Sequence, residues 1–323
     1  MTPIPRHPLL LAALIASLLS ACGGGGGGTT ENVTSSVTTT ASTPVGFDTT
    51  PYLGAPISTG NVATDGRNWI NYRRSQLGVV QLPQNTVVDR AAQSHSDYQR
   101  INDVITHDED ASKSGYTGVT LDARLATAGF KLTPNNYAYG EIISATTNNS
   151  GFFMAEELVT AIYHRFVMFE PVFKEMGTGS GTTARNYTYF TADFVANSGY
   201  GPGLGRGKLV GWPVNGQTSV QPNFFSDQEE PDPVTTANEV GYPVSVHGDI
   251  SATVLVSNFS IRPRNGSNLA VKLLQNSTDK NTPKSAAAII PLTRLNAATV
   301  YDVTFTGSAD GVPVSLNWSF TTK

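Results

Sequence analysis

The 323-residue chain has a single cysteine, Cys22, and few charged residues. One cysteine cannot form an intramolecular disulfide, and it cannot supply a cysteine-based metal or redox site. Charged residues make up 14% of the sequence, and the net charge is −4. Because no cluster of Lys and Arg is present, a nucleic-acid-binding surface is excluded. Hydrophobic residues make up 39%, too few for a multi-spanning membrane protein, so we expect a chain that buries its own cores in two domains.

Residues 1–21 have the pattern of a targeting segment. Arg6 and His7 form a short basic region, and the apolar run 9–19 is too short to span a bilayer as a helix. Two small residues then precede Cys22. This arrangement resembles the lipobox of bacterial lipoproteins, which are cleaved before a cysteine whose thiol takes a diacylglycerol. The alternative is an ordinary signal peptide in which the cysteine is incidental.

Residues 22–58 are predicted to be a lipidated cysteine followed by a flexible tether. Six glycines, 23–28, lead into a run rich in Thr and Ser, which cannot bury enough apolar surface to fold. Lipid chains at Cys22 would hold the protein stably on a membrane. Gly23 stands where an Asp would resemble an inner-membrane retention signal. We therefore expect an outer membrane, where the organism has one, and a mature protein that faces the periplasm or the exterior.

Residues 59–207 have a helical pattern first and a strand pattern later. Apolar side chains recur at helical spacing over residues 69–77, 82–102 and 155–169. Residues 187–195 alternate and are rich in β-forming side chains, which predicts a strand. Helices and strands within one unit indicate an α/β or α+β domain.

Residues 208–323 follow a Gly/Pro-rich segment, 199–207, and differ from the first domain in their sequence pattern. Short strand-like runs are separated by Gly, Asn, Asp and Pro. About seven such runs in this length predict a small β-sandwich.

Several short motifs in the first domain occur in a fixed order. They are Asn68 to Arg74, His107, Arg124, Gly129-Phe130, Gly140-Glu141, Tyr163-His164-Arg165 and Gly177-Thr178-Gly179. Together they resemble bacterial members of the CAP superfamily (cysteine-rich secretory proteins, antigen 5 and pathogenesis-related 1; the SCP domain) over about residues 60–200. The resemblance implies an α-β-α sandwich with a central cleft. In that family the cleft is lined by two histidines and up to two glutamates, and in several members the histidines hold a divalent metal.

The resemblance assigns cleft residues by position. His107 matches the first histidine, Glu141 the glutamate of the Gly-Glu motif, and His164 the second histidine. The usual place of the second glutamate falls near Ala161, which cannot serve. Glu157 is the candidate instead, because it precedes His164 by two helical turns and shares its face. The predicted cleft is therefore His107, Glu141, His164 and Glu157, with His107 and His164 as ligands of Zn²⁺ or another divalent cation.

The chemistry of this cleft has two interpretations. Two imidazoles and a carboxylate suit Zn²⁺, and a metal-bound water with Glu141 as general base would permit hydrolysis. Alternatively, His107, Glu141 and His164 form a buried hydrogen-bonded network that only stabilises the fold. The sequence has no Gly-x-Ser-x-Gly motif and no phosphate-binding loop. We therefore assign no catalytic residue.

Five other polar residues have simpler expected roles. We expect His95 to pack in the core and His247 to lie on the surface. Glu109 belongs to an acidic run that is expected to be a solvated loop or to hold a hard cation. Arg124 and Arg165 are expected to have structural roles, in which each could pair with a cleft carboxylate.

The second domain resembles a bacterial Ig-like module in residues 295–303 and 318–322. The expected fold is thus α+β: a CAP-type α-β-α sandwich (59–207) followed by a small all-β Ig-like sandwich (208–323).

Three functions are compatible with the sequence. The favoured one is a membrane-tethered CAP protein that binds a lipid, another small apolar ligand or a cell-envelope component, with or without metal assistance. The second is a metal-dependent extracellular hydrolase of the peptidase kind. The third is a structural or adhesive envelope protein.

Overall fold

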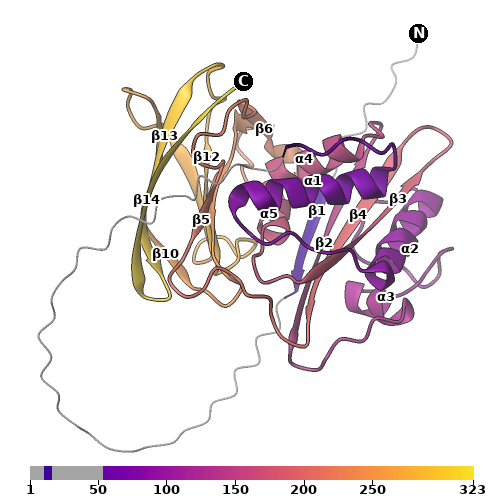
Figure 1. Cartoon of the computed structure of the whole chain (residues 1–323). Coiled ribbons are helices and arrows are strands. Elements are labelled where there is room, and N and C mark those ends of the chain that lie inside the picture. The colour runs from indigo at the N-terminus through magenta and orange to yellow at the C-terminus, as the bar shows by residue number, and fades with distance from the viewer. Residues whose placement is uncertain (1–10, 17–53) are drawn as a thin grey trace, which may run out of the picture.

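The computed structural model describes the backbone of residues 11–16 and all of residues 54–323 (Figure 1). Cys22, the tether and most of the predicted signal peptide lie outside the described residues. The described chain has an α+β N-terminal region followed by an all-β C-terminal region. No helix among the described residues is long and apolar enough to cross a membrane.

Five helices are formed in the described N-terminal region: α1 (Val62–Leu77), α2 (Thr86–Asn102), α3 (Leu121–Thr127), α4 (Gly151–Thr160) and α5 (Ile162–Met168). Asn61 and Asn85 cap α1 and α2, because each side-chain oxygen accepts a hydrogen bond from a free amide of the first turn. Gly78 ends α1 with a φ of 81°, a conformation that glycine adopts without strain. The first two helices predicted from the sequence are confirmed.

The third predicted helix, residues 155–169, is instead parts of two helices that are separated at Ala161. Ala161 has extended backbone angles (φ −68°, ψ 119°), which interrupt the helical path. The backbone groups that the break leaves without helical partners are bonded by side chains. The Arg165 side chain donates to the carbonyl oxygens of Val159 and Thr160, and the free amides at the start of α5 donate to Glu229. The spacing of apolar residues within a helix gives no information on such distant partners. The break was therefore not predicted.

One sheet runs through the N-terminal region in the order β3-β4-β2-β1-β7. Its strands are β3 (Glu175–Thr182), β4 (Thr188–Asn197), β2 (Tyr137–Thr146), β1 (Leu11–Ala16) and β7 (Glu229–Glu230). All neighbours are antiparallel except β1 and β7. Strand β4 confirms the strand predicted over residues 187–195. Strand β1 lies within the apolar run assigned to the signal peptide, so cleavage before Cys22 would leave β2 at the edge of the sheet.

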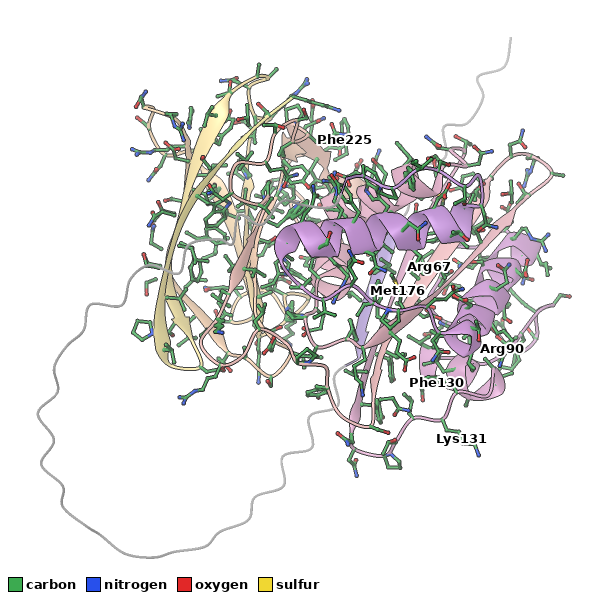
Figure 2. All side chains as sticks on the ribbon, viewed as in Figure 1. Arg67, Arg90, Phe130, Lys131, Met176 and Phe225 are labelled. Carbon is green, nitrogen blue, oxygen red and sulfur yellow. The ribbon has the colours of Figure 1, made fainter. Side chains whose placement is uncertain are left out.

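Helices cover both faces of this sheet (Figure 1). A Cβ placed on Gly177 of β3 would lie 2.2 Å from the backbone of α2, and one placed on Gly140 of β2 would lie 2.6 Å from Val167 of α5. Successive strand residues face opposite sides, so Gly140 and Glu141 point to different layers. Helices α2 and α3 form one layer, in which the Arg90 side chain donates to the Ala128 carbonyl just after α3 (Figure 2). Helices α1, α4 and α5 form the other layer.

The C-terminal region consists of small antiparallel sheets. The first is β10 (Val254–Pro263), β13 (Val300–Ala309) and β14 (Val312–Thr321). The second is β11 (Val271–Gln275), β12 (Ala286–Pro291), β9 (Val244–His247) and β5 (Val210–Trp212). Strands β6 (Asn223–Phe225) and β8 (Glu239–Gly241) form a third pair, and a short 3-10 helix, Ser226–Gln228, follows β6.

The two regions share one continuous hydrophobic core. The rings of Phe169 and Trp212 lie 5.0 Å apart across the boundary. The amide of Ile250 donates to the Glu170 carboxyl at 2.9 Å. His247 packs against Phe169 and is only 2% exposed, which corrects the expectation that it lies on the surface. The C-terminal region is therefore packed onto helix α5, and contacts from it reach the candidate site residues.

Candidate functional site

Glu141 on β2 is the centre of a buried ion-pair network. Arg124 Nη2 donates to both Glu141 oxygens, at 2.8 and 2.7 Å, and His107 Nδ1 lies 2.7 Å from Glu141 Oε1. Because the carboxylate only accepts, Nδ1 of His107 carries the hydrogen. Burial alone raises the pKa of Glu141, but His95, Arg124 and His107 outweigh it and hold the pKa well below the ordinary value. Glu141 is thus a fully paired anion.

A second carboxyl group lies beside Glu141. Asp193 on β4 is the register partner of Glu141 on β2, and both side chains are fully buried. Burial, followed by the negative charge of Glu141, raises the pKa of Asp193 well above its ordinary value. Two adjacent buried carboxylates would repel each other, which favours the neutral form of Asp193.

His95 and Glu109 extend the network on the same layer. His95 Nδ1 lies 2.9 Å from Glu109 Oε1, and Nε2 lies 2.7 Å from the Thr106 carbonyl oxygen. Each ring nitrogen of His95 thus lies within hydrogen-bond distance of an oxygen acceptor. Glu109 also accepts from the amides of Thr117 and Gly118. Burial works to raise the pKa of Glu109, but its bonds to His95 and Thr117 lower it overall.

These contacts confirm one sequence expectation and correct another. His95 is buried in the core, as predicted. Glu109 is only 2% exposed, so it does not belong to a solvated loop. Glu109 is buried because the loop between α2 and α3 places its carboxylate against His95. The acidic run contains no local sequence signal for this contact.

His164 has a different partner. Its Nδ1 lies 3.1 Å from Oε1 of Glu229, and the amides of Ile162, Tyr163 and His164 donate to the same carboxylate. Both side chains are fully buried. Glu229 lies 65 residues beyond His164 in sequence, and nothing in its local pattern marks it as a site residue.

Within the described chain, Glu157 has no hydrogen bond to His107 or His164, and the break at Ala161 places it on a different helix from His164. It is half-buried and lines a cavity of about 160 Å³ together with Thr160 and Phe224. Burial, reinforced by the neighbouring Glu156, raises the pKa of Glu157. Of the four predicted cleft residues, the structure pairs His107 with Glu141, pairs His164 with Glu229, and places Glu157 elsewhere.

The two histidines share a feature that suits metal ligands. Each has Nδ1 on a carboxylate, while Nε2 is buried without a hydrogen-bond partner in the described part of the chain. A carboxylate on the second ring nitrogen is typical of metal-bound histidine. However, Glu141 and His107 belong to the α2/α3 layer, and His164 belongs to α5 in the opposite layer. Within residues 11–16 and 54–323, no group of three or more His, Cys, Asp or Glu side chains is arranged to hold a metal ion.

The N-terminal region is a CAP domain: residues 68–194 match the family described as "CAP: Cysteine-rich secretory protein family". Two solved structures are similar in part. An extracellular protein containing a SCP domain from Bacillus anthracis str. Ames has 18% identity and a TM-score of 0.36, over 45% of each chain. An outer surface protein from Borrelia burgdorferi has 17% identity and a TM-score of 0.35, over 45% of this chain and 99% of that one.

The matched region thus spans less than half of the length of the first of these structures. No curated protein matches the chain.

Proposed function

We propose that this CAP-domain protein is exported, is anchored by a lipid on Cys22, and binds a lipid-like or cell-envelope ligand without turning it over. The observation that supports binding over catalysis is the pairing of both carboxylate oxygens of Glu141. Glu141 accepts from Arg124 and His107, and burial together with the charge of Glu141 raises the pKa of the neighbouring Asp193. A general base needs a pKa near the working pH, whereas the pKa of Glu141 is held far below it.

The proposed location rests on the amino-terminal sequence. The apolar run that ends at Cys22 supports lipidation, and the following glycine-rich tether supports a position away from the membrane surface. We propose that the all-β C-terminal region is an Ig-like module. Its packing against α5 supports a role in stabilising the CAP domain, in addition to a role as a spacer.

Metabolic labelling tests the anchor. Radiolabelled palmitate should enter the wild-type chain and should not enter a Cys22→Ala variant, which should be released from the membrane fraction. Equal labelling of the two chains would contradict lipidation at Cys22. The expected membrane is the outer one in an organism that has two, and fractionation of the labelled cells identifies it.

Ligand uptake tests the binding function. The full chain carrying Cys22→Ser would be titrated with a fluorescent palmitate analogue. The bound probe would then be extracted, and its molecular mass would be measured by mass spectrometry. We expect saturable uptake and recovery of intact probe. An absence of uptake would contradict a lipid-like ligand, and recovery of a cleaved or otherwise altered probe would indicate an enzyme.

One observation favours a metal-dependent hydrolase as the second candidate. The unpartnered Nε2 atoms of His107 and His164 are available to a cation such as Zn²⁺. Calorimetric titration of the full chain with Zn²⁺ tests it, with His107→Ala and His164→Ala as separate variants. Loss of binding in each single variant would support a shared site, and unchanged binding in both would exclude these histidines.

A structural or adhesive role is the third candidate, and it is favoured by the same pairing of the Glu141 carboxylate. It predicts that His107→Ala lowers the melting temperature and changes no interaction. Retained uptake of the palmitate analogue by a stable His107→Asn variant would separate ligand binding from this site.

A further inference from the structure

A second cavity lies between the CAP domain and the C-terminal region, apart from the His107–Glu141 network. It has a volume of about 410 Å³. Its walls come from one face of α1, from Glu156 of α4, and from the loop 214–221 that follows β5. Cavities of about 300–1,000 Å³ at domain boundaries are the usual size and place of small-molecule sites.

The α1 wall is aromatic and held in place. Trp69 and Tyr72 are three residues apart, so they lie on the same side of the helix, and their ring centroids are 5.3 Å apart. Trp69 Nε1 donates to Glu156 Oε2 at 2.7 Å. The Arg73 guanidinium lies 5.0 Å from the Trp69 ring centroid and 5.4 Å from that of Tyr72. The rings are half-buried and fixed in position before any ligand arrives.

The charges in this wall cancel. Arg73 donates from Nε and Nη2 to the two oxygens of Glu156, each at 2.8 Å. Its Nη1 donates to Gln76 Oε1 at 2.7 Å. With Arg73 and Glu156 paired, the cavity has no free charge among its lining side chains, which favours an uncharged ligand.

Hydrogen-bonding groups remain available around the aromatic wall. Gln76 Nε2 donates to the Tyr72 hydroxyl oxygen at 2.8 Å, which leaves the Tyr72 hydroxyl hydrogen free to donate. Thr218 and Ser219 on the loop are exposed, and neither hydroxyl is bonded within the described chain. The loop is anchored to the C-terminal region, because Gly216 N donates to the Ser319 carbonyl oxygen and Val220 N donates to that of Thr321.

We infer that this cavity binds a neutral saccharide of one or two sugar units. A sugar ring has an apolar C–H face and a rim of hydroxyl groups. The electron-rich faces of aromatic rings attract the C–H groups, and the hydroxyl and amide groups of the cavity rim pair with the sugar hydroxyls. A lipid chain would offer no acceptor to the Tyr72 hydroxyl, and an anionic ligand would find no free cation in the described cavity wall, because Arg73 is paired with Glu156.

The experiment uses the full chain carrying Cys22→Ser. It would be titrated with N,N′-diacetylchitobiose and with cellobiose, followed by tryptophan fluorescence and saturation-transfer NMR. We expect saturable binding of at least one disaccharide. Tyr72→Phe should weaken it about fivefold, because one hydrogen bond of about 1 kcal/mol is lost. Thr218→Arg should abolish it by filling the cavity.

Two controls separate this site from others. Ser277→Arg places the same side chain at an exposed position in the turn between β11 and β12, and it should bind as the wild type does. His107→Asn should also leave saccharide binding unchanged, since His107 is not part of the cavity wall. Absence of binding to both disaccharides, or equal binding by wild type and Thr218→Arg, would overturn the inference.

Discussion

His164 on helix α5 hydrogen-bonds Glu229, a residue outside the matched CAP segment, at 3.1 Å. The same carboxylate accepts from three amides at the start of α5. One side chain from the C-terminal region therefore completes a helix terminus in the CAP domain. Any experiment on His164 requires a chain that contains Glu229, and a fragment that ends at residue 207 lacks it.

Replacing Glu229 should destabilise the fold. In Glu229→Ala the buried amides and His164 lose their acceptor, which should cost roughly 3 kcal/mol of the free energy of unfolding. Glu229→Gln keeps an acceptor oxygen and should cost less. Glu230→Ala, at the exposed neighbouring position, is the matched control and should change little. Urea denaturation of the full chain measures all three, and equal midpoints for Glu229→Ala and Glu230→Ala would contradict the role of this carboxylate.

Removing Arg124 should leave Glu141 buried and unpaired. The Arg124 side chain has no exposed area, and it binds both Glu141 oxygens. Loss of one partner of such a pair typically costs about 3–5 kcal/mol, so Arg124→Ala should unfold at a much lower temperature than the wild type. Arg67→Ala on α1 (Figure 2) removes a partly exposed arginine and should stay within about 0.5 kcal/mol. Similar melting temperatures for the two variants would show that the Arg124–Glu141 pair adds little.

Ionisation of Glu170 should lower the free energy of unfolding as the pH rises from weakly acidic to weakly basic values. Burial raises the pKa of Glu170 from 4.5 to about 8, against the lowering effect of its bonds to the Val172 and Ile250 amides. Between those values the folded state holds a proton that the unfolded state has released. The stability that the protonated Glu170 adds to the folded state is therefore fully present below pH 4.5, and it is lost as the pH rises through about 8.

Glu170→Gln tests this pH dependence, because the amide imitates the neutral acid and does not ionise. The melting temperature of the variant relative to the wild type should rise from about pH 5 to about pH 8.5, the range that spans the two pKa values. Glu239→Gln, at an exposed position, should run parallel to the wild type over the same range. A constant difference between Glu170→Gln and the wild type would mean that Glu170 is already ionised in the folded protein.

Cleavage before Cys22 should expose an edge of the sheet. Strand β1 pairs with β2 over residues 139–143, so its removal would leave one side of β2 without backbone partners. In hydrogen exchange, alternate amides of β2 should exchange faster in a chain that begins at Cys22 than in the uncleaved chain. Strand β4 has neighbours on both sides in either chain and serves as the internal control. Equal protection of β2 in the two chains would mean that β1 does not shield this edge.

The position of Glu141 illustrates how far the sequence predicted the candidate site. The Gly-Glu motif indicated a cleft glutamate and His107 as its neighbour, and the structure joins the two at 2.7 Å. The structure also confirms that Arg124 pairs with a cleft carboxylate, but the motif held no information on the contact of Arg124 Nη2 with both Glu141 oxygens or on Asp193 as a neighbour of Glu141. Both depend on which residues the β2–β4 register and the α2/α3 layer bring together.

Sequence by itself determined the local features of this protein. The caps at Asn61 and Asn85, the end of α1 at Gly78 and the formation of β4 from a run of β-forming residues each depend on residues a few positions apart. Tertiary structure decided the break at Ala161, the burial of Glu109 and His247, and the pairing of His164 with Glu229. The physical reason is that a buried charge or free amide must find a partner wherever the fold supplies one, and that partner can lie far away in the chain.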